Sequence, residues 1–239
     1  MNGPGLAAAL LLVAACACIG QPGAAQPAPR RPNATAQPAA HRPDTAAGQR
    51  LANNGKADSM PPCAQCHGQN GVPDPATGFP RLPGQTAQYL YKQLRDYASG
   101  QRDNPIMGPI ASALSDAERQ DVSAYYAAMD SPYPAPAAQD PKQQQDGAAL
   151  ANLGSGDRRV QACANCHGPA GTGMAPLYPR LAGQYAAYAT AQFEAFRGGS
   201  RKNDVGAVMR DIARNLPDED VTAVANYLES LRPGEKASP

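Results

Sequence analysis

One short motif occurs twice in this chain, and the sequence around it repeats with it. The two copies are Cys63-Ala-Gln-Cys66-His67 and Cys163-Ala-Asn-Cys166-His167. Further along, Pro-Arg-Leu-x-Gly-Gln occupies positions 80–85 and again positions 179–184. The offset between matching residues drifts only from 99 to 102 positions, so few insertions separate the copies. A fixed period of this kind indicates an internal duplication, in which each half should use equivalent residues for equivalent roles.

Shifts in composition divide the chain into five segments. Residues 26–45 are rich in Pro and Ala and lack periodic apolar positions, so they cannot bury enough surface to order themselves. A second Pro-rich stretch lies between the two copies of the repeat, which is typical of a domain boundary. We expect an export signal over 1–25, a flexible leader over 26–45, a first domain over 46–133, a linker over 134–145 and a second domain over 146–234.

The N-terminal apolar run predicts export from the cytoplasm into the periplasm of a bacterium. Residues 6–15 are apolar but too few to span a bilayer, which is typical of the core of a signal sequence. The positive charge that usually precedes this core is missing, because the first basic residue is Arg30. The four residues that end at Cys16 resemble a lipobox, in which the cysteine is lipidated and tethers the protein. Cleavage near Ala17 or Ala25 would instead release a soluble protein, and both readings stay open.

Charge and core size limit the classes of function. The net charge is +1, from 21 basic and 20 acidic side chains, which lacks the basic excess of a nucleic-acid-binding protein. Aromatic residues make up 5% of the chain and Trp is absent, so two such small domains have little material for a core. We therefore expect a large flat cofactor to fill part of each interior.

The apolar pattern predicts an all-α fold with the same helices in both halves. No stretch shows the strict alternation of a half-buried strand. Ser115 and Glu118 have the spacing of a capping box, which predicts that the last helix of the first half begins there. The predicted helices are 46–53, 86–99 and one from Ser115, with counterparts at 147–153, 185–197 and from near Pro217.

The C-x-x-C-H motif is the attachment signature of c-type haem. Two thiols on one helical turn can each add to a vinyl group of the same porphyrin, and the next residue then lies under the iron. A thioredoxin-like pair would need a surrounding βαβ pattern, and a single zinc site would need shorter spacing between the cysteine pairs. Two disulfides would leave both histidines unexplained. We therefore expect two haem c groups, attached through Cys63, Cys66, Cys163 and Cys166.

The axial ligands follow from register and elimination. His67 and His167 are the proximal ligands, and the third histidine, His41, lies in the expected leader, so bis-histidine ligation at both haems is excluded. A methionine thioether is the usual alternative and raises the reduction potential. Only Met107 and Met209 match in the repeat, each in a loop before the last helix. The other candidate methionines are too close to a motif or have no methionine opposite them.

Two further pairs of residues follow the same register. We expect the backbone carbonyls of Pro80 and Pro179 to accept a hydrogen bond from the proximal imidazole and so fix its tautomer. Arg81 and Arg180 are candidates to pair with the haem propionates. The alternative for both arginines is an exposed position in a loop.

These motifs resemble the class I cytochrome c fold, and their tandem arrangement resembles the two-haem cytochrome c4 family. The resemblance covers residues 46–232. It implies a periplasmic carrier that passes electrons from a cytochrome bc complex to a terminal haem–copper oxidase. The Pro-rich leader and the lipobox-like residues depart from a plain soluble carrier and favour a subunit tethered in a respiratory complex.

The function expected from these residues is outer-sphere electron transfer without catalysis. Histidine and methionine would fill both axial positions of each haem, so no site stays open for oxygen or peroxide. A two-haem peroxidase is the alternative from another class, and it would need one haem with a vacant distal side. A dedicated cytochrome subunit of a dehydrogenase complex is a third reading.

Overall fold

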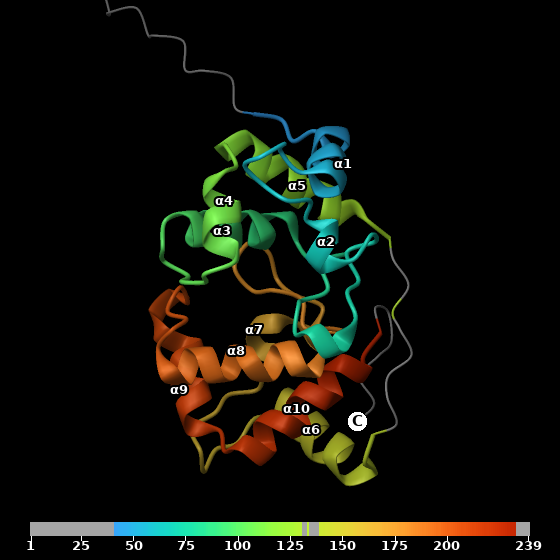
Figure 1. Ribbon diagram of the computed structural model, residues 1–239. Coiled ribbons are helices and arrows are strands. Elements are labelled where there is room, and N and C mark those ends of the chain that lie inside the picture. The colour runs from blue at the N-terminus through green and yellow to red at the C-terminus, as the bar shows by residue number, and fades with distance from the viewer. Residues whose placement is uncertain (1–40, 131–132, 134–138, 233–239) are drawn as a thin grey trace, which may run out of the picture. The chain divides into compact units, whose positions relative to one another are not determined.

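The structure is a computed structural model that describes residues 41–130, 133 and 139–232 (Figure 1). These residues form helices, turns and loops, with four isolated bridges and no β-strand. None of the helices within them is both long and apolar enough to cross a membrane. The predicted all-α fold is therefore confirmed. The expected signal, the lipobox-like residues and most of the leader lie outside the described residues.

The same order of five α-helices occurs in residues 41–130, the first half, and in residues 139–232, the second half. In Figure 1 the helices of the first half run from blue to green and those of the second half from yellow to red. They are α1 (Thr45–Asn54), α2 (Ala64–His67), α3 (Ala87–Ala98), α4 (Met107–Ser112) and α5 (Asp116–Ala128), then α6 (Pro141–Leu153), α7 (Ala164–His167), α8 (Ala186–Gly198), α9 (Val208–Asn215) and α10 (Asp218–Ser230). Short 3-10 turns lie at Pro75–Thr77, Pro169–Gly171 and Val205–Ala207.

The first and last helices of each half cross in close contact, α1 with α5 and α6 with α10. A Cβ atom on Gly48 would lie 2.2 Å from the carbonyl oxygen of Asp121, and one on Gly147 would lie 2.3 Å from that of Ala223. Only glycine therefore allows the two backbones to come so near. The first helix of each crossing pair also contacts the motif helix of its half, α1 with α2 and α6 with α7.

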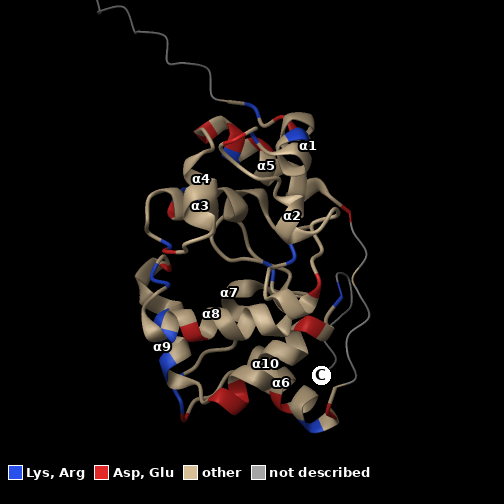
Figure 2. Cartoon of the chain, viewed as in Figure 1, with Lys and Arg blue, Asp and Glu red and all other residues tan. Residues whose placement is uncertain are grey.

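The last helix of the first half, α5, begins with the predicted capping box, whereas the last helix of the second half, α10, begins without one. The capping box of α5 is present, since Ser115 Oγ accepts from the Glu118 N–H at 3.3 Å and the Glu118 carboxylate accepts from the Ser115 N–H at 2.7 Å. Pro217 is the N-cap residue of α10 and not its first helical residue. The first turn of α10 is acidic, with its residues red on the cartoon in Figure 2, and this complements the helix dipole.

Three local expectations need correction. Helix α6 begins at Pro141, inside the expected linker, and not at Gly147, because the Asp140 carboxylate caps it at 2.7 Å from the Lys142 N–H. Short helices α4 and α9 occupy the segments before the last helices that were expected to be loops. His41 is not loose, since its Nε2 lies 2.7 Å from the Asp121 carboxylate of α5.

Candidate haem-binding sites

Each motif forms a single helical turn that ends at its histidine. The His67 N–H donates to the Cys63 carbonyl at 2.9 Å, and the His167 N–H donates to the Cys163 carbonyl at 2.8 Å. All four motif cysteines are free of disulfide bonds. Within the described part of the chain, no group of three or more His, Cys, Asp and Glu residues could hold a metal ion between them. The disulfide and zinc readings of the motif therefore find no support in the structure.

Burial favours the neutral forms of Cys63, Cys163 and the two motif histidines. It raises the pKa of the Cys63 and Cys163 thiols to about 11, so neither is a thiolate at neutral pH. It also lowers the pKa of the His67 and His167 imidazoles, although the hydrogen bond to a proline carbonyl opposes this shift. A neutral imidazole has the free lone pair that a metal ligand needs.

The imidazoles of the two motifs are oriented as predicted. His67 Nδ1 lies 3.1 Å from the Pro80 carbonyl oxygen, and His167 Nδ1 lies 2.9 Å from that of Pro179. A carbonyl can only accept, so Nδ1 carries the proton and Nε2 keeps the lone pair. The rings of Phe79 and Tyr178 pack against the two imidazoles, with 5.9 Å between ring centroids in both cases.

A cavity of about 660 Å³ reaches both motifs. Apart from the motif residues, the walls of this cavity are largely apolar, with side chains such as Leu90, Ile110, Phe193 and Ile212. Two thiols, an imidazole and a thioether on apolar walls are the donor set that a covalent haem requires. All eight residues predicted as attachment points or iron ligands line this cavity: Cys63, Cys66, His67, Met107, Cys163, Cys166, His167 and Met209.

The two methionines lie on short helices and not in loops, which corrects the expectation. Met107 is the first residue of α4, and Met209 is the second residue of α9. The Met107 N–H donates to the Asn104 side-chain oxygen at 2.8 Å, which fixes the start of α4. In the second half, Asp204 accepts from the Arg210 N–H at 3.1 Å and takes this capping role for α9. A sequence reading misses such short helices because their caps lie several residues before them.

The two arginines after the prolines are drawn together by Tyr133. The Arg81 guanidinium lies 3.7 Å from the centroid of the Tyr133 ring, and Arg180 Nη1 donates to the Tyr133 hydroxyl at 3.1 Å. Arg81 is 6% exposed, so the reading of an exposed loop residue is wrong for it. Among the described residues, the buried Nε of Arg180 has no hydrogen-bond partner. A carboxylate of a bound cofactor is the kind of acceptor this atom requires.

Two repeated glutamines tie the halves together beside the sites. Gln85 donates to the Arg180 carbonyl at 3.0 Å and accepts from the Arg180 N–H at 2.9 Å. Gln184 makes the same pair of bonds with the backbone of Arg81, both at 3.0 Å. Each glutamine thus completes the Pro-Arg-Leu segment of the opposite half, next to the carbonyl that orients the histidine.

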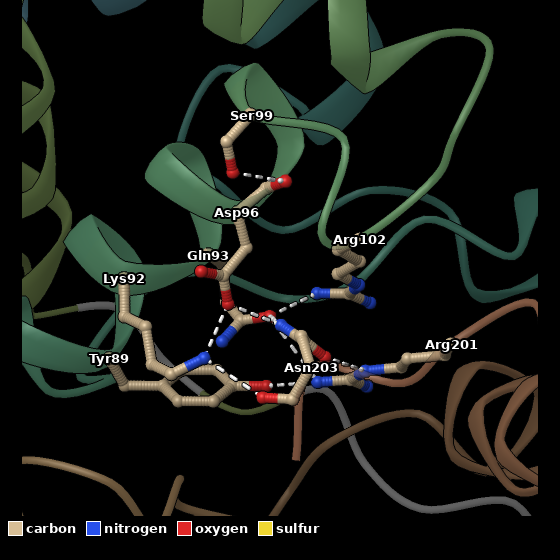
Figure 3. A network of polar contacts seen from close by, with 8 residues as sticks. All are labelled: Tyr89, Lys92, Gln93, Asp96, Ser99, Arg102, Arg201 and Asn203. Carbon is tan, nitrogen blue, oxygen red and sulfur yellow. Dashed lines mark hydrogen bonds and ion pairs between the residues drawn. The ribbon is translucent and has the colours of Figure 1, made fainter. Parts of the chain in front are cut away.

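A second repeated set forms a buried network between α3 and α8, part of which Figure 3 shows. Arg102 donates to Tyr188 at 3.0 Å and Gln192 at 2.6 Å across the interface. Arg201 donates to Tyr89 at 2.9 Å and Gln93 at 3.3 Å in return. These positions match in the repeat with an offset of 99, Tyr89 with Tyr188, Gln93 with Gln192 and Arg102 with Arg201, but the match alone gave them no role. The sequence signal for this interface was the repetition of uncharged polar residues outside the haem motifs, where haem binding does not explain them.

Comparisons with known proteins agree with this geometry. The family model described as Cytochrome c matches residues 45–130 and 135–232. The thiosulfate dehydrogenase electron acceptor of Stutzerimonas stutzeri (strain A1501) is 45% identical over 187 residues, which are 78% of this chain and 87% of that relative. Cytochrome c4 of Thiocapsa roseopersicina is 39% identical over 189 residues, 77% of this chain and 93% of that protein.

A solved structure gives the same result for the fold. The crystal structure of reduced recombinant cytochrome c4 from Pseudomonas stutzeri superposes with a TM-score of 0.70 at 33% identity, over 80% of this chain and 100% of that chain. Two family matches in tandem, each with its own cysteine pair, imply two covalently bound haem c groups. The chain belongs to the cytochrome c family and is a dihaem electron carrier of the cytochrome c4 type.

Proposed function

We propose that this protein accepts single electrons from a thiosulfate-oxidising dehydrogenase and passes them toward a terminal haem–copper oxidase. The name of the 45% identical relative from Stutzerimonas stutzeri supports a dehydrogenase as the donor. A cytochrome bc complex is the alternative donor, as in the expectation from the cytochrome c4 family. The observation that carries the electron-transfer role is that both complete sets of ligand side chains line one cavity reached from both halves.

In the proposed first site, Cys63 and Cys66 would attach the haem, and His67 Nε2 and the Met107 sulfur would bind its iron. In the second site Cys163, Cys166, His167 and Met209 would have these roles. The bound haem supplies an iron that cycles between ferrous and ferric and so stores one electron. The chain supplies the rest. The Pro80 and Pro179 carbonyls hold the imidazoles in one tautomer, and the apolar walls keep water away.

Two ligands from the protein at each haem leave no position for a substrate, which supports a carrier and not a peroxidase. Keeping the same ligands in both oxidation states also keeps the rearrangement on electron transfer small. Arg81 and Arg180 offer positive charge to the propionates, and burial strengthens such pairs. The reciprocal glutamine bonds hold the two sites in one unit, as a relay within one chain requires.

The test of the donor uses the native dihaem protein in a stopped-flow spectrophotometer. Thiosulfate together with a purified thiosulfate dehydrogenase should reduce both haems, two electrons per molecule, within the turnover time of the enzyme. Thiosulfate without the enzyme is the control and should reduce neither haem. Rapid reduction by quinol and a cytochrome bc complex, with none by the dehydrogenase, would contradict the proposed donor.

A second measurement separates carrier from enzyme. Carbon monoxide added to the reduced protein should bind neither haem rapidly, because a methionine holds each distal position. A Met209→Ala variant is the positive control and should bind carbon monoxide at one haem. Rapid binding by the unaltered protein would favour a haem enzyme of the peroxidase type.

We place the protein in the periplasm, either soluble or tethered by a lipid on Cys16. The apolar residues 6–15 and the lipobox-like residues 13–16 support this location. Intact mass spectrometry of the native protein tests the two forms. Two haems add a fixed mass in both, and an acylated Cys16 at the new N-terminus adds a further increment.

A further inference from the structure

The segments that lead to the two methionines differ in length and backbone strain. Met107 lies five positions after Arg102, whereas Met209 lies eight positions after the matching Arg201, so the second segment is three residues longer. It contains Gly206 at φ +65° and Ala207 at φ +61°. The left-handed conformation is unfavourable for an alanine, so this longer segment needs support from its surroundings.

The shorter segment is held by its own residues. The Asn104 side-chain oxygen accepts from the N–H groups of Ile106 at 3.0 Å and Met107 at 2.8 Å. The Asn104 carbonyl accepts from the Gly108 N–H at 2.9 Å. The position of Met107 thus depends on local bonds within the first half.

The matching asparagine of the longer segment turns to the other half. Asn203 Nδ2 donates to the Asp96 carboxylate at 2.5 Å and to Gln93 at 3.0 Å, both on α3 of the first half (Figure 3). Lys92 Nζ donates to the Asn203 carbonyl at 2.9 Å and also forms an ion pair with Asp96. We call Lys92, Asp96 and Asn203 the interdomain clamp.

The clamp works in one direction only. With the offset of 99 that relates Arg102 to Arg201, the positions equivalent to Lys92 and Asp96 are Ala191 and Ala195. The second half therefore has no counterpart to Lys92 and Asp96 at these two positions. Asp96 is 8% exposed, so its bond to Asn203 is shielded from water and from salt.

We propose that Lys92 and Asp96 are positioning residues for the distal ligand of the second haem, so that the first half of the chain holds Met209 in place. The inference rests on the proposed ligation of that haem by Met209. It makes the ligation and the reduction potential of the second haem dependent on docking of the two halves. The segment before Met107 has no counterpart to this clamp among the described contacts, because Asn104 bonds within its own half.

The test is Asp96→Ala in the complete dihaem protein, read at each haem separately. Met107→Ala and Met209→Ala first assign the two methionine–iron charge-transfer bands of the ferric protein. In Asp96→Ala, added imidazole should displace Met209 about tenfold faster, and the reduction potential of the second haem should fall, because a charge-assisted bond that holds the ligand segment is lost. The first haem should keep its rate and potential.

Matched variants keep the test decisive. Asn104→Ala should show the converse, with faster displacement at the first haem alone, and Asp96→Asn should restore part of the loss because it keeps an acceptor oxygen. Lys92→Met replaces Asp96→Ala if the latter does not fold. Equal changes at both haems, or none, would overturn the clamp while leaving the ligand assignment intact. If Met209→Ala removes no band, the ligand assignment itself fails and the clamp with it.

Discussion

The two halves agree closely on the histidine side of each motif and differ on the methionine side. His67 and His167 both donate to a proline carbonyl at matching positions. Met107 follows a segment capped by its own asparagine, whereas the segment before Met209 is capped by Asp204 and is also bonded through Asn203 to α3 of the opposite half. The histidine side is fixed by the motif and its neighbours. The methionine side is where a duplicated chain gives its two haems different surroundings.

The interface shows why polar residues outside the haem sites also repeat. Gln85 bonds the backbone of Arg180, and Gln184 bonds that of Arg81, so each contact has its mirror. This is the pattern of an isologous interface, in which one patch serves both partners. A change in one copy therefore removes one of two equivalent sets of bonds, and the comparison of the halves can be tested residue by residue.

The largest expected effect tests whether the helix crossing is the same frame in both halves. Gly48→Ala and Gly147→Ala should each lower the free energy of unfolding by about 3 kcal/mol, because the added Cβ would lie within 2.2 Å or 2.3 Å of a carbonyl oxygen across the crossing. Denaturant unfolding measures the change. Gly198→Ala, with nothing within 4 Å, is the control and should be neutral or slightly stabilising. A loss below about 1 kcal/mol in either variant would contradict the common frame.

The buried arginines test whether the interface is as symmetric as its hydrogen bonds. Arg102→Ala and Arg201→Ala should each weaken docking by about 2 kcal/mol, because partly buried tyrosine and glutamine acceptors lose a charged donor. Calorimetry should then resolve two unfolding transitions, and electron transfer between the haems should slow. Arg214→Ala, on an exposed arginine of α9, is the control with little expected change.

One asymmetry should remain within that pair. Arg201 also donates from Nε to the Asn203 side chain at 3.1 Å, and Arg102 has no counterpart to this bond among the described contacts. Arg201→Ala should therefore also lower the reduction potential of the second haem. If both variants shift both potentials equally, the two halves are coupled more evenly than their contacts indicate.

The sequence predicted those features that local chemistry or register decides. The capping box at Ser115 and the two proline carbonyls needed only spacing within one half. The start of α6 was missed because Asp140-Pro141 is equally the signature of a turn and of a capped helix. The packing of α6 against α10 decides between a turn and a helix. The apolar periodicity of one segment cannot reveal such a contact.

The roles of the interface residues could not be predicted for a different reason. A buried polar side chain is tolerated only where a partner satisfies it, and here the partner comes from the other copy of the repeat. Register showed that Gln93 and Gln192 match, but not that the two halves face one another. The one-way clamp was hidden as well, because Lys92 and Asp96 look like an ordinary ion pair on a helix surface.

Tyr133 offers a finer comparison, because it contacts an arginine of each half. Its ring stacks on Arg81, and its hydroxyl accepts from Arg180. Tyr133→Phe should cost about 1 kcal/mol of unfolding free energy and shift the potential of the second haem more than that of the first, because the bond from Arg180 is lost while the ring stays over Arg81. Tyr133→Ala should shift both potentials. Redox titration of both variants checks this, and equal shifts in Tyr133→Phe would show that the arginines act as one unit.

The smallest expected effect concerns the ion pairs that tie the first loop of each half to its last helix. Lys56 pairs with Glu118 at 3.0 Å in the first half, and Arg158 pairs with Asp220 at 3.1 Å in the second. Burial raises the pKa of Glu118, but the Ser115 N–H and Lys56 lower it more, so the folded pKa lies below the ordinary 4.5.

A lowered pKa means that the contribution of Glu118 to stability is complete well above pH 4.5 and is lost as the pH falls below that value. Glu118→Gln should lower the unfolding free energy by less than about 1 kcal/mol at pH 7 and by a smaller amount near pH 4, since the pair is partly exposed. Lys56→Met and the double variant complete a cycle that isolates the pair from the capping bond of Glu118 to Ser115. Denaturant unfolding at both pH values is the measurement. An equal loss at pH 4 and pH 7 would show that the capping hydrogen bond, and not the charge of Glu118, supplies the stability.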